Sequence, residues 1–126
     1  MEYEGWLLNM GTNYYVVKNG PSINSAIHIG KSSGGWLFNF QKQNEPFRDP
    51  PVVWSSYPEV MNWLYRHTVE DPQYVIMDEY EEIVPYDAFE ALVQQKQRDP
   101  FCHDNPDNFS WSENVGGYRF SSGEFS

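Results

Sequence analysis

A glycine, a lysine and a serine follow one another at Gly30, Lys31 and Ser32, as they do at the end of a phosphate-binding loop. That motif requires a further glycine upstream, at the position that Ser25 occupies here, and a helix directly after the serine. The helix is needed because its N-terminal amides hold the phosphates. In this chain an alternating apolar stretch follows instead. The pattern therefore argues against a nucleotide-hydrolysing loop.

A smaller anion site at the same segment stays open. A cation, two hydroxyls and two glycines stand there beside a large aromatic residue, and backbone amides in such a turn can hold an anion. The candidate residues are His28, Lys31, Ser32, Ser33, Gly34, Gly35 and Trp36. A hairpin turn with a solvated lysine is the simpler interpretation. In both interpretations we expect Lys31 to be at least partly exposed.

The strongest charge feature is residues 70–90, which contain eight acids and no lysine or arginine. Such a segment produces a local negative field that attracts a basic partner surface and competes for a groove meant for nucleic acid. A solvated hairpin and helix face is the alternative interpretation. The candidate contact residues are Asp78, Glu79, Tyr80, Glu81 and Glu82.

Other chemistry has little support in the sequence. His28, Cys102 and His103 could be three metal ligands, but no paired-cysteine spacing accompanies them. Cys102 and His103 are chain neighbours, which rarely point at each other as a nucleophile and its base must. Glu81 and Glu82 point to opposite faces if they lie on a strand. We therefore expect no catalytic residue, no metal site and no cofactor.

Charge and length narrow the class of protein. Eighteen acids against eight bases leave a net charge of −10, which disfavours direct binding to nucleic acid or to an anionic membrane. The 126 residues fit one domain. The single cysteine excludes an internal disulfide, and neither a signal peptide nor a membrane-spanning run is visible. These features predict a cytoplasmic domain.

Local patterns predict the elements that must position these side chains. Strands are expected at 14–18, 26–31 and 36–40, with a glycine turn at 32–35, and at 74–77 and 82–84. A capping box at Ser56 and Glu59 begins a helix that ends before Pro72. A second helix from Tyr86 closes before Pro100, a polar loop spans 99–117, and 118–120 returns as an edge strand. This order predicts an α+β fold, with a small, mainly antiparallel sheet packed against two helices.

The expected core lies between the sheet and both helices. Its members share strand alternation or helical spacing. They are Trp36, Phe38, Phe40, Val60, Trp63, Leu64, Phe89, Leu92 and Val93.

Several stretches carry a family likeness: residues 10–15 (MGTNYY), 28–36 (HIGKSSGGW), 78–80 (DEY) and 117–126 (GYRFSSGEFS). In these the chain resembles a family of uncharacterised small proteins of tailed bacteriophages. Many members carry a Cys-x-x-Cys ahead of the second stretch, where this chain has residues 18–22 without cysteine. A zinc-ribbon-like site is therefore not expected here. Members also tend to begin at the methionine that corresponds to Met10, so the resemblance implies that residues 1–9 are an extension or follow an upstream start.

The resemblance implies a phage accessory protein that acts in the host cytoplasm by binding and inhibiting a host protein, such as a defence complex. The acidic segment 70–90 would suit a target with a basic surface. The alternative is a small domain that binds or hydrolyses a nucleotide-like anionic ligand at residues 28–35.

Overall fold

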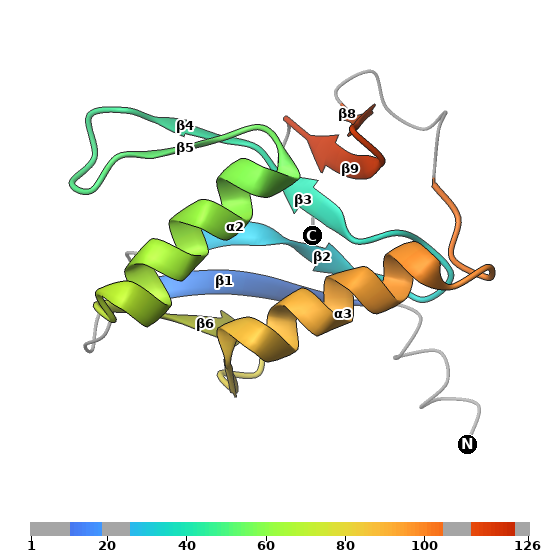
Figure 1. The fold of residues 1–126 in the computed structure, drawn as a ribbon, viewed down its shortest axis with the longest axis horizontal. Coiled ribbons are helices and arrows are strands. Elements are labelled where there is room, and N and C mark those ends of the chain that lie inside the picture. The colour runs from blue at the N-terminus through green and yellow to red at the C-terminus, as the bar shows by residue number, and fades with distance from the viewer. Residues whose placement is uncertain (1–10, 19–25, 105–111, 123–126) are drawn as a thin grey trace.

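The computed structural model describes residues 11–18, 26–104 and 112–122. They form an α+β fold, as the sequence predicts, in which a seven-stranded sheet is covered on one face by α2 (Tyr57–Tyr65) and α3 (Tyr86–Arg98) (Figure 1). The strand order is β7-β6-β1-β2-β3-β9-β8. All neighbouring pairs are antiparallel except β3 and β9, which run parallel.

Four strands of the sheet confirm predicted β segments. They are β1 (Thr12–Lys18), β2 (Ile27–Ser32), β6 (Tyr74–Asp78) and β7 (Ile83–Val84). Ile27 and Ile29 of β2 enter the core, whereas His28 stacks on Tyr15. Because β2 continues through Lys31 to Ser32, no helix begins at this segment. The structure therefore agrees with the argument against a phosphate-binding loop.

The predicted strand at 36–40 is shorter than expected. Strand β3 (Asn39–Gln41) begins three residues later, and the connection from β2 passes through an exposed turn in which Gly35 has a φ of +81°. Trp36 belongs to that turn and is 41% exposed, so its assignment to the core is wrong. Strand alternation placed it inward, but alternation predicts burial only within a continuous strand, and Trp36 forms an isolated bridge with His103 outside β3.

A hairpin occupies part of the predicted loop at 99–117. Strand β8 (Ser112–Val115) pairs with β9 (Tyr118–Ser121) across Gly116 and Gly117, whose φ angles are +60° and +94°. Two successive positive φ angles suit the tight turn of a hairpin. The polar side chains of β8 hide it from a hydrophobic pattern. Strand β9 is consequently internal to the sheet, not its edge as predicted, and β8 is the edge.

A second, two-stranded sheet was missed between Gln43 and Trp54. Strands β4 (Gln43–Glu45) and β5 (Val52–Trp54) form a hairpin near the start of α2 (Figure 1). The prolines in this stretch suggested a loop. Trp54 is nevertheless fully buried, and its indole nitrogen donates to the Gln41 carbonyl at 2.7 Å. The buried indole ties the hairpin to β3.

Helix α2 begins at Tyr57 as the sequence predicts and continues as a π-helical turn, η2 (Arg66–Glu70), that ends before Pro72. Only half of the predicted capping box forms. The Glu59 carboxylate accepts from the Ser55 amide at 3.0 Å and from the Ser56 hydroxyl at 3.0 Å. The Ser56 side chain makes no cap bond to the helix backbone.

The core lies between the sheet and the helices, and most of the predicted members are in it. Leu92 is only partly buried and packs against it, and Trp36 lies outside. The buried members of the prediction are Phe38, Phe40, Val60, Trp63, Leu64, Phe89 and Val93. Phe38 contacts the rings of Phe40 and Phe89, which joins the sheet to α3.

Candidate functional sites

The first candidate site is a small pocket of about 110 Å³ beside the turn that follows β2, which we call the Arg119 pocket. Strands β2, β3, β8 and β9 and the segment after α3 each contribute to its walls. The lining residues are Lys31, Ser33, Trp36, Leu37, Asn39, His103, Asp104, Ser112 and Arg119. The pocket therefore combines cations, hydroxyls and an aromatic wall.

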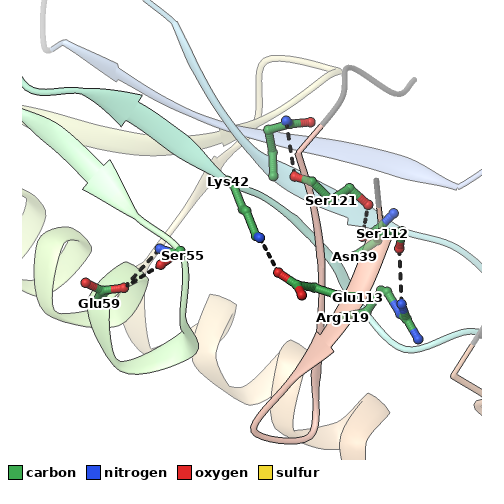
Figure 2. Close-up of polar contacts among 9 residues, drawn as sticks. Asn39, Lys42, Ser55, Glu59, Ser112, Glu113, Arg119 and Ser121 are labelled. Carbon is green, nitrogen blue, oxygen red and sulfur yellow. Dashed lines mark hydrogen bonds and ion pairs between the residues drawn. The ribbon is translucent and has the colours of Figure 1, made fainter. Parts of the chain in front are cut away.

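Arg119 is the most buried charged group of this pocket, with 7% of its side chain exposed. Its Nε donates to Asp104 Oδ1 at 2.7 Å. Its Nη1 donates to Ser112 Oγ at 3.3 Å (Figure 2). The other carboxylate oxygen of Asp104 accepts from the Asn114 amide at 2.8 Å. A guanidinium taken from water needs such partners, because an unpaired buried charge is costly. The network holds Arg119 in one position.

The turn that carries Trp36 is held in place by two other segments. The Lys96 ammonium of α3 donates to the carbonyls of Ser33 and Trp36 at 2.7 and 3.1 Å. His103 donates its amide to the Gly35 carbonyl at 2.8 Å and accepts from the Leu37 amide at 3.0 Å. The wall of the pocket is thus fixed by hydrogen bonds to its backbone, donated or accepted by Lys96 and His103.

Only some residues of the predicted anion segment lie together in the structure. Lys31, Ser33 and Trp36 line the Arg119 pocket. Gly34 and Gly35 are exposed, and neither these two glycines nor Ser32 and His28 belong to its lining. The Trp36 amide donates to the Ser33 carbonyl within the turn. Lys31 is partly exposed, as predicted.

His28 lies on the sheet face opposite α2 and α3, in a polar network. Its Nε2 is 2.9 Å from Asn13 Oδ1, and its ring stacks on Tyr15 with centroids 5.0 Å apart. Asn13 in turn donates its backbone amide to Glu79 at 2.6 Å. The side chain of His28 thus holds β1 and β2 together on this face.

Sequence reasoning missed Asp104, His103 and Arg119 as members of one pocket. Arg119 carried a usable signal, since a lone arginine between Tyr118 and Phe120 must face away from their packed rings. Asp104 carried none, because its position depends on the fold of the segment after α3. Contacts between segments so far apart in the chain leave no trace in local spacing.

The second candidate site, which we call the acidic trough, is a hollow of about 290 Å³ on β1 and β6. Apolar or aromatic side chains form part of its wall, and carboxylates form the rest. The lining residues are Tyr15, Val17, Ala26, Met77, Asp78, Glu79 and Glu81. Three of the five predicted contact residues, Asp78, Glu79 and Glu81, therefore line one hollow.

Two of these acids also shape the backbone. Asp78 Oδ1 accepts from the amides of Tyr80 and Glu82 at 2.8 and 3.0 Å, which closes the turn between β6 and β7. Glu79 Oε1 accepts from Asn13, as described above. Glu81, at the turn, has a φ of +65° and is exposed. Each of these carboxylates keeps a further oxygen that can accept another hydrogen bond.

The rim of the acidic trough continues into exposed apolar groups. Tyr80 is 66% exposed and Ile83, on the edge strand β7, is 64% exposed. Ion pairs between described residues join Lys42 to Glu113, Arg48 to Glu45 and Arg119 to Asp104. Within the described part of the chain, none of the eight acids of residues 70–90 is in an ion pair.

Within residues 11–18, 26–104 and 112–122, no group of three or more histidine, cysteine, aspartate or glutamate side chains is placed to hold a metal ion. No helix among these residues is long and apolar enough to cross a membrane. Comparison of the chain with protein-family models, with curated protein sequences and with solved structures finds no match.

Proposed function

We propose that this protein is an accessory protein that binds and inhibits a host protein through its acidic surface, as the likeness to a bacteriophage family implies. The observation that carries the proposal is the acidic trough, in which carboxylates border an apolar hollow beside the exposed side chains of Tyr80 and Ile83. A target with a basic surface is the matching partner, and a defence effector is the class of host target we expect.

The trough suits lysine and arginine side chains of such a partner. Their aliphatic stems pack along apolar surface while their charged heads reach polar groups. Here the wall formed by Val17, Ala26 and Met77 would receive the stem, and Asp78, Glu79 or Glu81 the head. The acids of residues 70–90 would also attract the basic partner over a distance and so raise the association rate. Salt would screen this attraction. A partner that normally holds nucleic acid in a basic groove would be inhibited by competition.

The experiment compares two variants with the same change in charge. Glu81→Gln with Glu82→Gln neutralises two exposed acids beside the trough, and Glu45→Gln with Asp49→Asn neutralises two exposed acids near the β4–β5 hairpin. Each protein is immobilised and exposed to bacterial lysate at low salt, and the retained proteins are identified by mass spectrometry. We expect a host protein on the wild type and on the control variant, and its loss from the trough variant and at high salt.

The recovered host protein is then assayed for its own activity with and without this chain. Inhibition by the wild type and the control variant, with a much weaker effect of the trough variant, is the expected result. The proposal is wrong if no host protein exceeds background, or if both variants retain it equally.

The alternative function, binding or hydrolysis of a nucleotide-like ligand at residues 28–35, has less geometric support. The pocket that those residues share is about 110 Å³, whereas sites for drug-sized ligands are about 300–1,000 Å³. A thermal-shift screen with nucleotides tests this function, because a ligand that binds only the folded state raises the melting temperature. We expect a flat screen.

A further inference from the structure

We infer that the Arg119 pocket is a binding site for a carboxylate group. This pocket lies at β2, β3, β8 and β9, whereas the acidic trough lies on β1 and β6. The inference therefore does not depend on the proposed protein-docking function. It is carried by one buried arginine, by the acid beside that arginine and by the size of the pocket.

Arg119 offers a hydrogen-bond donor that the fold does not use. Its Nε and Nη1 donate to Asp104 and Ser112, and no acceptor for Nη2 is found among the described residues. The fully buried side-chain atoms that lack a partner there are Gln41 Oε1 and Gln97 Oε1. Arg119 Nη2 is not among these buried atoms without a partner. The atom therefore keeps access to solvent, although the whole residue is only 6% exposed. A guanidinium fixed in this way is suited to binding an oxyanion.

The charge of the lining favours an anion with a single charge. Arg119 and Lys31 are the cations among the described lining residues, and Asp104 is the acid. The carboxylate of Asp104, in a chain whose net charge is −10, repels a phosphate dianion more strongly than a singly charged carboxylate.

The volume of the Arg119 pocket and the rest of its lining also favour a carboxylate. About 110 Å³ admits a small head group and excludes a nucleotide. Ser33 and Ser112 bring hydroxyl groups to the wall, while Trp36 and Leu37 provide an apolar side. A carboxylate with a short alkyl or peptide stem matches both parts. The group can belong to a small organic acid or to the end of a polypeptide, and the experiment separates these two sources.

The test is a titration of the isotope-labelled full chain, followed by two-dimensional NMR on the Trp36 indole and the Arg119 side chain. The probes are propionate, its neutral analogue propionamide, inorganic phosphate, and a short peptide with a free or an amidated C-terminus. We expect saturable shifts with propionate or with the free-carboxyl peptide, and none with propionamide or with the amidated peptide. Tighter binding of propionate identifies a free acid as the ligand class, and tighter binding of the peptide identifies a polypeptide terminus.

Variants locate the bound group. We expect Lys31→Gln and Arg119→Lys each to weaken carboxylate binding roughly tenfold, the effect of losing one charged hydrogen bond. Lys42→Gln removes the same charge outside the pocket, where Lys42 pairs with Glu113, and should bind like the wild type (Figure 2). If Arg119→Lys does not fold, Lys31→Gln and Ser112→Ala still report on the site. Tighter binding of phosphate than of any carboxylate, absence of binding, or equal weakening by Lys42→Gln would overturn the inference.

Discussion

The guanidinium of Arg119 and the carboxylate of Asp104 meet at 2.7 Å between strand β9 and the segment that follows α3. The arginine side chain is 7% exposed, whereas that of the aspartate is 31% exposed. The pair therefore joins a buried cation to a group at the border of solvent. Removal of the Asp104 charge has a direct consequence for stability, because the largely buried guanidinium would lose its counter-charge.

Asp104→Asn should lower the free energy of unfolding by roughly 1–3 kcal/mol. The substitution keeps the size of the side chain but leaves the buried guanidinium without its counter-charge, and the partial exposure of Asp104 reduces the full cost of a broken buried pair. Denaturant unfolding followed by fluorescence measures the change. The control is Glu45→Gln, which breaks the surface pair with Arg48 and should cost less than about 1 kcal/mol. Equal effects of the two substitutions would contradict the prediction.

Phe38→Ala should destabilise the protein by about 3–5 kcal/mol, because it removes a fully buried ring and leaves a cavity among aromatic neighbours. Phe47→Ala is the matched control, since Phe47 is 100% exposed in the β4–β5 hairpin and should change stability by less than about 0.5 kcal/mol. Both values come from the midpoints of denaturant curves. A small effect at Phe38 would show that β3 has a different register.

The contrast between Phe38 and Trp36 shows how far the sequence predicts this fold. Alternation identified Phe38 and Phe40 correctly, because a buried sheet face selects apolar residues at every second position. Phe38 directly precedes β3, whereas Trp36 has the same spacing but ends a turn that Lys96 and His103 hold from other segments. Local spacing contains no information about such distant anchors.

The same limit applies to the candidate sites. The acids of the trough are close in sequence, so their clustering was visible before the fold. The Arg119 pocket instead combines residues from Lys31 to Arg119, and only Lys31, Ser33 and Trp36 were predicted as site residues. The parallel pairing of β3 with β9 creates that pocket, and nothing in either short strand indicates the pairing.

The contribution of Glu59 should depend on pH. The pKa of its carboxyl is lowered, chiefly by the hydrogen bond from the Ser55 amide and then by the Ser56 hydroxyl. A lowered folded-state pKa means that the unfolded chain binds protons more readily, so the stabilisation is present above the unfolded value of about 4.3 and is lost as pH falls through the folded value. Glu59→Gln should therefore be less stable than the wild type at pH 7, by no more than about 0.5 kcal/mol, because solvent screens this exposed carboxylate.

Thermal unfolding of both proteins between pH 7 and pH 3 measures this dependence. The two melting temperatures should converge at the acid end of the range. A difference that stays constant across the range would mean that the ionised carboxylate does not provide the stabilisation.

Gly30→Ala should destabilise the protein by about 2–3 kcal/mol, the cost of forcing extra volume into a packed site. A Cβ at this position would lie 2.5 Å from the Phe38 ring and 2.3 Å from the Asn39 carbonyl oxygen, so β2 and β3 would have to separate. The glycine is thus required for packing between strands, although its place before Lys31 resembles a phosphate-binding motif. Denaturant unfolding measures the loss, and the propionate titration provides the contrast. If Gly30→Ala kept its stability and lost only anion binding, the glycine would serve a ligand and the packing argument would fail.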